Sequence, residues 1–379
     1  MAKADDARAD VIAGHATAEA TARYAASHAE RTAAGNFREF PGGVRASSLG
    51  LGTYLGREDA ATDSLYERAI GRALERGTNV LDTAINYRHQ RSERAIGRAL
   101  AASIARGTVA REDVVVATKG GYLAFDGEAP PDPRAYFAAT YVQPGIIRPG
   151  DVVGWHCMTP RFLADQIERS RANLGLETID VYYVHNPETQ LDEVERPEFL
   201  ARLRAAFGAL EEAVRARRIR WYGTATWNGY RVPPQERGHL SLAEVLAVAR
   251  EAGGDDHHFR VVQLPYNLAM LEAFTLANQP ADTGLVPMLR AAEHVGVYTM
   301  ASASMMQGQL ARGLPPELGT VLPGLATDAQ RALQFVRSTP GVGTALVGMK
   351  TVAHVEENAG VAATPPVAWE QFQRLFTAA

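Results

Sequence analysis

Four titratable residues stand where buried strands of the sequence are expected to end. Asp82 opens DTAINY and Tyr87 follows five residues later; Lys119 ends VVVATK and His185 ends VYYVH. In an α/β barrel the carboxyl ends of the parallel strands share one face, so we expect these side chains to meet there. Taken singly, each of these residues is better explained by a structural role, as a turn former, a packing residue or a solvated strand end. Their joint placement is what indicates a site.

The chemistry of this set points to proton transfer. An apolar strand rarely ends in a lysine without a partner, and Asp82 on the adjacent strand is the expected partner of Lys119. A free phenol has a pKa of ~10, and a nearby ammonium lowers that pKa. We therefore expect Lys119 to make Tyr87 an efficient general acid, and His185 to orient a carbonyl oxygen. The set has no strong nucleophile, and we expect no metal site.

The strand and helix pattern predicts how these residues are positioned. Candidate strands alternate with helices, and such alternation predicts a parallel sheet of an α/β fold. Eight units favour a closed (β/α)8 TIM barrel over a doubly wound sheet, which should open with G-x-G-x-x-G where this chain reads GLGTYLGRED. The expected strands are 48–53, 80–83, 114–118, 179–184, 219–224, 260–264, 297–301 and 345–348. The expected helices include 64–76 with a capping box at Ser64 and Glu67, 92–104, one from Thr159-Pro160, 199–216, 241–252, 285–294, 327–337 and 352–358.

Two further segments precede the predicted barrel strands, and a third is inserted between them. Residues 1–38 read as a solvated N-terminal helical arm, with an oligomer contact as one role, and 39–379 as the barrel domain. FREFPGGVRASS predicts an N-terminal β-hairpin. Residues 120–158 form an insertion after the third strand, which we expect to be an active-site lid, with a structural flap or a subunit contact as the alternative. Deletion of a lid over 125–150 should mainly change substrate choice and KM. The expected pocket walls are Tyr122, Phe125, Tyr136, Phe137, Tyr141 and Trp155, with Trp227 and Tyr230 from a later loop.

Composition excludes several classes of protein. The net charge is −4 without a basic block, which argues against nucleic-acid binding. We find neither a signal peptide nor the uncharged run of ~18 apolar residues that a membrane span needs. The single cysteine, Cys157, excludes a disulfide framework within the chain and fits a reducing, cytoplasmic setting. The tripeptide Trp155-His156-Cys157 lacks a second cluster at ligand spacing, so we do not interpret it as a metal site.

Five segments together resemble the successive signatures of the aldo/keto reductases. They are SSLGLGT, DTAINY with SERAIG, VVVATKGG, IDVYYVHNPE and LVGMKTVAHVEEN, and the resemblance runs from about residue 40 to 358. It implies a barrel that binds NADP(H), with NAD(H) as the alternative, without a Rossmann motif. It also implies that Asp82, Tyr87, Lys119 and His185 are the catalytic residues, and that Tyr87 gives or takes the proton while hydride passes between nicotinamide and a carbonyl carbon.

The resemblance also assigns binding positions. It implies that Gln263 contacts the carboxamide, that Lys350, Thr351 and His354 contact the 2′-phosphate, and that Glu357 and Asn358 lie near the adenine. The full set of expected cofactor positions is Gly52, Thr53, Asp82, Thr226, Gln263, Ser302, Met305, Gln307, Gly308, Leu310, Gly348, Lys350, Thr351, His354, Glu357 and Asn358. Substrate contacts are expected from Tyr54, Tyr122, Trp155, Asn186 and Trp227.

Four positions depart from the family pattern. Ala225 and Thr226 stand where the family often has Ser-Asn, and Ser302 stands where an aromatic residue often covers the nicotinamide. His354 replaces the usual arginine of the adenine-phosphate segment, which weakens the preference for NADP(H) over NAD(H).

Two alternatives to a carbonyl reductase stay open, and a third is set aside. The same residues suit an NAD(P)+-dependent sugar or alcohol dehydrogenase, and the same barrel suits a non-catalytic redox-sensor subunit that holds the cofactor. A lyase or isomerase with a Schiff base on Lys119 would leave Asp82 and Tyr87 without a role. The expected partners are a small carbonyl or sugar substrate, with no nucleic acid and no membrane, and association with further copies of the chain stays open.

Overall fold

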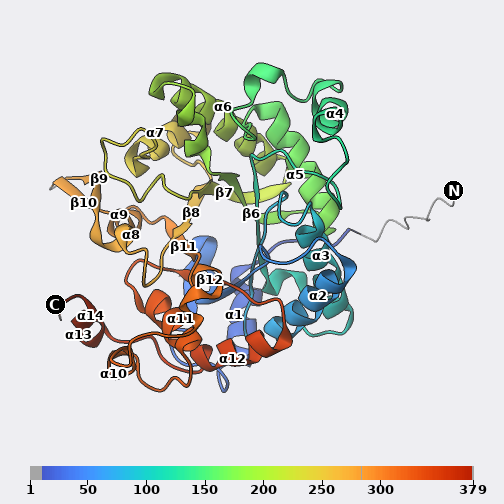
Figure 1. Cartoon of the computed structure of the whole chain (residues 1–379). Coiled ribbons are helices and arrows are strands. Elements are labelled where there is room, and N and C mark those ends of the chain that lie inside the picture. The colour runs from blue at the N-terminus through green and yellow to red at the C-terminus, as the bar shows by residue number, and fades with distance from the viewer. Residues whose placement is uncertain (1–10, 283, 378–379) are drawn as a thin grey trace.

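A computed structural model describes residues 11–282 and 284–377. Within these ranges eight parallel strands close into a barrel in the order β11-β12-β3-β4-β5-β6-β7-β8 (Figure 1). The (β/α)8 barrel predicted from the sequence is therefore confirmed. The strands are β3 (Leu49–Gly52), β4 (Val80–Asp82), β5 (Val115–Gly120), β6 (Ile179–His185), β7 (Ile219–Ala225), β8 (Phe259–Pro265), β11 (Tyr298–Ser302) and β12 (Thr344–Gly348).

Helices surround this barrel (Figure 1). They are α2 (Ala60–Glu75), α3 (Arg91–Ala105), α5 (Pro160–Leu174), α6 (Arg196–Arg215), α7 (Leu242–Gly253), α9 (Met288–His294), α11 (Asp328–Ser338) and α12 (Val352–Ala362), with short helices α8 (Glu272–Thr275), α10 (Leu318–Val321), α13 (Trp369–Phe372) and α14 (Arg374–Thr377). Most lie within a few residues of their predicted ranges.

Two predicted helices begin elsewhere. The helix predicted from Ser64 starts four residues earlier, because Asp59 caps it by accepting the N–H of Thr62 at 2.7 Å. The helix predicted over 285–294 is two elements. Its first residues form β10 (Gly284–Pro287), which pairs antiparallel with β9 (Ala277–Ala281), and only then does α9 begin.

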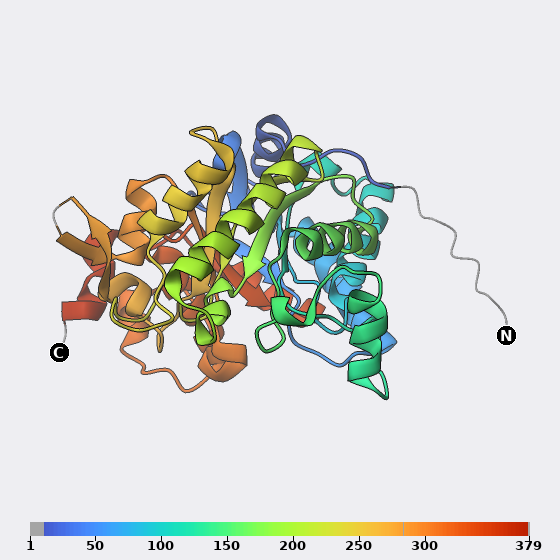
Figure 2. The same cartoon turned by 90° about the horizontal axis from the view of Figure 1, so that it is seen from above.

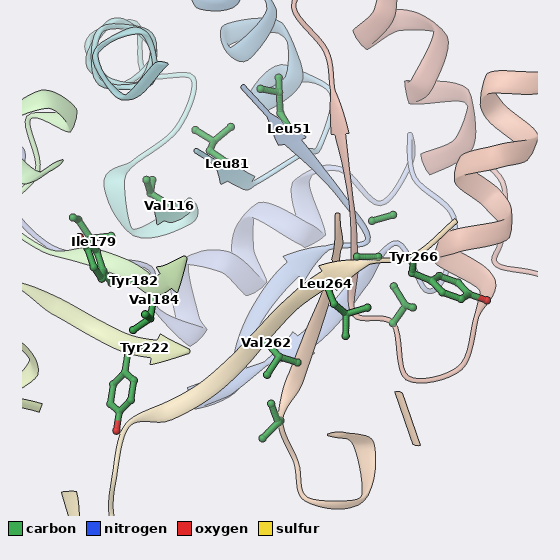
Figure 3. Close-up of a cluster of buried hydrophobic side chains, with 14 of the residues drawn as sticks. Leu51, Leu81, Val116, Ile179, Tyr182, Val184, Tyr222, Val262, Leu264 and Tyr266 are labelled. Carbon is green, nitrogen blue, oxygen red and sulfur yellow. The ribbon is translucent and has the colours of Figure 1, made fainter. Parts of the chain in front are cut away.

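Alternate residues of each strand build two buried layers. Val80, Val115, Val181, Val261 and Met300 pack inside the barrel. The intervening residues pack outward against the helices (Figure 3), among them Leu51, Leu81, Val116, Val184, Val262 and Leu264. Strands buried on both faces are continuous apolar runs, which explains why the sequence pattern located them well.

The predicted N-terminal β-hairpin is confirmed, and it closes the amino-terminal end of the barrel. Strands β1 (Phe37–Phe40) and β2 (Val44–Ser47) pair antiparallel, and Phe40, Val44 and Ala46 join the interior cluster. Figure 2 shows helix α1 (Ala18–Ser27) at this end of the barrel and the teal-green insertion at the opposite end.

The expectation of a solvated arm is wrong for its described part. In α1, Ala20, Thr21 and Tyr24 are buried, and the Tyr24 hydroxyl donates to the carbonyl of Leu74. One apolar face of the helix therefore packs on the barrel. Residues 1–10 lie outside the described ranges, and the domain division at residue 38 stays a prediction.

The insertion has a small core of its own, which corrects the expected pocket walls. Phe137, Tyr141 and Ile147 form this core with Cys157 and Phe162, and Phe125 and Tyr136 pack against it. The insertion contains α4 (Pro133–Phe137). Tyr230 is also buried elsewhere, with its hydroxyl 2.8 Å from Thr224 Oγ1. Phe137, Tyr141 and Tyr230 are thus buried packing residues of loops.

None of the helices in the described ranges combines the length and the apolar character that crossing a membrane requires.

Candidate active site

The predicted pair of Lys119 and Asp82 is present at the carboxyl end of the barrel. Lys119 Nζ donates to Asp82 Oδ1 and to the carbonyl of Thr83, both at 2.7 Å. Gln263 Nε2 donates to Asp82 Oδ2, also at 2.7 Å. The side chains of Lys119 and Asp82 are only 1% and 7% exposed. The carboxylate is thus held from two sides, and the ammonium is fixed by two oxygens.

Strand register explains this arrangement. Asp82 is paired with Ala117 on the neighbouring strand β5. Lys119 lies two residues further on, so its side chain points to the same face of β5 as the interior residue Ala117. Gln263 approaches from β8, where it is paired with Ala225 and Met300. The three side chains therefore meet at the top of the barrel interior.

Tyr87 and His185 lie beside this pair. Lys119 Nζ is 5.0 Å from the centroid of the Tyr87 ring, and the Tyr87 and His185 ring centroids are 5.9 Å apart. Tyr54 meets the Tyr87 ring edge-on at 4.9 Å, and Tyr122 meets His185 in the same way at 5.1 Å. The four predicted residues are thus brought together, with a tyrosine on either side.

The turn that carries Tyr87 has an unusual backbone that the sequence did not reveal. Arg88, His89 and Gln90 all have φ between 48° and 70°, a left-handed conformation that costs free energy in residues other than glycine. Buried Arg88 bonds Asp63, and Gln90 Nε2 donates to the carbonyl of Phe125 at 2.8 Å. Contacts with α2 and with the insertion therefore hold this turn in place.

The pKa of Tyr87 is shifted opposite to the expectation. Burial, followed by the charge of Asp82, raises the pKa of this phenol well above its ordinary value. The expected lowering by Lys119 fails chiefly because the phenol is buried, and the charge of Asp82, 2.7 Å from the ammonium, adds to the rise. Tyr87 is therefore protonated at neutral pH, ready to donate but not prone to ionise.

Burial also shifts the other two groups toward their neutral forms. It lowers the pKa of Lys119, against the opposing effect of Asp82. It lowers the pKa of His185 well below the usual range, with smaller contributions from Lys119 and His156. His185 is therefore a neutral imidazole, and its Nδ1 is buried without a hydrogen-bond partner in the described part of the chain.

The expected cofactor positions follow neighbouring strands. Gly52 with Thr53, Thr226, Ser302 and Gly348 stand at or just after the ends of β3, β7, β11 and β12. Met305, Gln307, Gly308 and Leu310 lie in the loop after β11. Lys350 and Thr351 lead into α12, where Thr351 Oγ1 accepts the N–H of His354 at 3.3 Å, and Glu357 and Asn358 follow on the same helix. All these positions are on loops at the carboxyl end or on α12.

Two of these positions carry buried polar atoms without a partner among the described residues. They are Thr226 Oγ1 and Asn358 Oδ1. Such atoms cost free energy unless a ligand or water satisfies them. Thr53 and Gln263 differ, because their side chains already bond the carbonyl and the carboxylate of Asp82.

The expected substrate residues form two groups. Tyr54, Trp155 and Trp227 are 55%, 56% and 47% exposed, a high value for large aromatic side chains. Tyr122 and Asn186 are bonded to each other, with Asn186 Nδ2 donating to the Tyr122 hydroxyl at 3.1 Å. Tyr54 and Tyr122 also contact the rings of Tyr87 and His185, so they are the two of this set that lie against the candidate catalytic residues.

Sequence reasoning missed two supporting side chains. Glu188 accepts the backbone N–H groups of Trp227, Asn228 and Gly229 at 2.8–3.2 Å and so shapes the loop after β7. His156 bonds the carbonyl of His185 at 2.7 Å. Neither has a partner close to it in sequence, so no local pattern signalled either role.

Comparison with known proteins gives one consistent family. The model of the aldo/keto reductase family matches residues 48–314. The oxidoreductase YqkF of Bacillus subtilis, itself described as uncharacterized, is 23% identical over 319 residues, covering 82% of this chain and 86% of that protein. Prostaglandin F synthase 1 of Bos taurus is 28% identical over 139 residues, or 37% of this chain and 31% of that enzyme.

Solved structures agree in architecture. A glycerol dehydrogenase from Gluconobacter oxydans superposes with a TM-score of 0.64 at 18% identity, covering 91% of this chain and 95% of that one. An aldo/keto reductase from Klebsiella pneumoniae, in complex with NADP and acetate, superposes with a TM-score of 0.59 at 22% identity, covering 90% and 95%. At such identities these likenesses show the shared fold alone.

Proposed function

This chain belongs to the aldo/keto reductase family, and we propose that it is an NADP(H)-dependent oxidoreductase that interconverts a carbonyl and an alcohol, with Tyr87 as the general acid and base. One observation carries the proposal. A buried ammonium–carboxylate pair, Lys119 and Asp82, lies beside the rings of Tyr87 and His185.

The residues present fit the cofactor. The unpartnered Thr226 Oγ1 suits a carboxamide, and the unpartnered Asn358 Oδ1 suits the amino group of an adenine. A Cβ added to Gly348 would meet nothing within 4 Å, so the chain leaves open space there. Lys350 and the amino terminus of α12 would hold the 2′-phosphate. Two Klebsiella pneumoniae structures of the same fold were solved with NADP and NADPH, which supports this choice. When bound, NADPH supplies the hydride.

The chain's own residues account for the proton. Neutral His185 donates a hydrogen bond to the substrate oxygen and orients it. Tyr87 then passes its phenolic proton to that oxygen as negative charge develops, and the Lys119 ammonium stabilises the phenolate that is left. Asp82 and the carbonyl of Thr83 hold Lys119 in position. In alcohol oxidation the same groups act in reverse.

Two measurements on purified protein test the proposal. Fluorescence titration should show tight binding of NADPH and weaker binding of NADH, and the consumption of NADPH should depend on an added aldehyde or ketone. Tyr87→Phe should lower kcat by about 10²–10⁴-fold, because a general acid is removed, while the Kd for NADPH stays unchanged. Binding of neither nucleotide, or full activity of Tyr87→Phe, would refute the proposal. Initial rates with NADP+ and alcohols or sugars then decide the preferred direction.

A further inference from the structure

A fully buried histidine at the base of the insertion bonds the backbone of His185. His156 is 0% exposed, and its Nε2 lies 2.7 Å from the carbonyl oxygen of His185, 29 residues away in sequence. We propose that His156 is a positioning residue: it fixes the carbonyl of His185 and thereby aims the His185 ring at the substrate oxygen. The assignment of a role to His185 rests on the proposed function, whereas the contact itself does not.

Strand geometry explains why His185 needs this contact. The pairing of β6 with β5 ends at Gly120 and Val184, so His185 lies one residue past the last rung on that side. Asn186 then takes a left-handed conformation with φ of 46°. The carbonyl of His185 is thus left without a β5 partner at the point where the chain turns. The imidazole of His156 supplies the missing donor.

A directional chain of hydrogen bonds sets the tautomer of His156. Arg202 Nη1 donates to Gln190 Oε1 at 2.7 Å, and an arginine can only donate. The Gln190 amide is therefore oriented so that its Nε2 donates to His156 Nδ1 at 2.9 Å. Nδ1 is then the acceptor, and the ring proton lies on Nε2, where it points at the carbonyl of His185.

Burial keeps this imidazole neutral. It lowers the pKa of His156 to about 4, with the hydrogen bond to His185 opposing the shift. Both ring nitrogens are used by protein groups, which leaves none for a metal ion. The sequence Trp155-His156-Cys157 thus serves a structural contact rather than metal binding.

Backbone hydrogen bonds hold the residues on either side of His156. Cys157 N donates to the carbonyl of Gly121 at 2.7 Å, and Leu123 N donates to that of Trp155 at 2.9 Å, so the two ends of the insertion are joined. Gly121 has φ of 140°, and a Cβ there would lie 2.7 Å from His156 Nε2 and 3.1 Å from the carbonyl oxygen of His185. Only glycine permits the two histidines to approach at this point.

The decisive test compares two substitutions of the same side chain. A glutamine at position 156 can place its amide N–H near the former Nε2, whereas leucine cannot donate. We expect His156→Leu to lower kcat about 10- to 100-fold, because a misplaced reacting group costs up to about 10²-fold, with the Kd for NADPH unchanged. His156→Gln should restore most of kcat. Equal losses in both folded variants, or no loss in His156→Leu, would overturn the proposal.

A backbone pair of variants adds a matched control. Gly121→Ala should lower kcat in the same way as His156→Leu, because the added Cβ separates the two histidines. Gly150→Ala lies in the same insertion, where an added Cβ meets nothing within 4 Å, and should leave kcat unchanged. An unaffected Gly121→Ala enzyme would contradict the inference.

A spectroscopic readout separates this inference from the proposed function. In ¹⁵N-histidine-labelled protein, His156 should show the neutral Nε2–H tautomer, and His156→Leu should shift the resonances of His185. These signals test the contact even if the wild-type protein reduced no carbonyl, a result that would refute only the proposed function. A His156 ring protonated on Nδ1 alone, or unchanged His185 resonances in His156→Leu, would refute the inference itself.

Discussion

The buried pair of Lys119 and Asp82 should be strongly coupled in folding stability. At 2.7 Å and an effective dielectric constant of about 20, the attraction between the two charges is about 6 kcal/mol. Most of this offsets the cost of burying both groups, so the pair adds little net stability. Removing one partner, however, leaves an uncompensated buried charge. We expect Asp82→Asn and Lys119→Met each to lower the free energy of unfolding by about 3–5 kcal/mol.

A double-mutant cycle measures this coupling. In urea unfolding without nucleotide, the double variant should lose about 2–3 kcal/mol less than the sum of the single variants, as is typical of residues in direct contact. The exposed pair of Arg204 and Glu251, whose side chains are 52% and 50% exposed, is the matched control and should couple by less than about 1 kcal/mol. Additive effects at Lys119 and Asp82 would show that the two charges do not compensate each other.

Three further outcomes follow from pKa shifts and from helix capping. The rate of carbonyl reduction should hold through neutral pH, because burial raises the pKa of Tyr87 and keeps this general acid protonated. The rate should fall in alkaline solution, because burial lowers the pKa of Lys119 and its ammonium loses a proton there. A maximum rate in alkaline solution would contradict this. The free energy of unfolding should decline by up to about 3 kcal/mol as the pH falls from about 6.5 to about 4, because the unfolded chain protonates His156 first; urea titrations of His156→Gln should lack that part of the decline. Thr351→Ala should cost about 1 kcal/mol by removing the cap of α12, and equilibrium unfolding without any loss would show that the cap is not needed.

The barrel and the core of the site were predictable because their signals are local. Val115 and Val116 begin a continuous β-branched run, which is typical of a strand buried on both faces. A lysine at the end of that run demanded a partner, and Asp82 on the adjacent strand was the group able to supply one. Strand ends and parallel order therefore followed from local patterns in the sequence, and the ion pair followed from two polar residues at the ends of adjacent strands.

The remaining features depend on contacts between distant segments. The pKa of Tyr87 is raised chiefly by burial and then by the charge of Asp82, and no sequence spacing shows that the ring is buried. The aromatic residues of the insertion looked like pocket walls, because a sequence does not show that Phe137 and Tyr141 face each other in a separate core. The contact of His156 with His185 joins positions on either side of an entire helix, α5.

We therefore expect the insertion to act on catalysis in a different way from the predicted lid. Gly127 N donates to the carbonyl of His89 at 2.8 Å, and the carbonyl of Phe125 accepts from Gln90, so the insertion holds the strained turn after Tyr87. Deleting 125–150 removes both contacts but keeps His156. We expect the deletion to lower kcat along with any change in KM, because the left-handed turn relaxes without its anchors.

Steady-state kinetics on several carbonyl substrates distinguish this role from that of a lid. Gln90→Leu, which removes one anchor and leaves the insertion in place, should reproduce part of the loss in kcat. A lid that only selects substrates would change KM from one substrate to another while kcat stayed constant. A constant kcat in both the deletion and Gln90→Leu would show that the turn keeps its conformation unaided, and that the insertion acts on substrate binding alone.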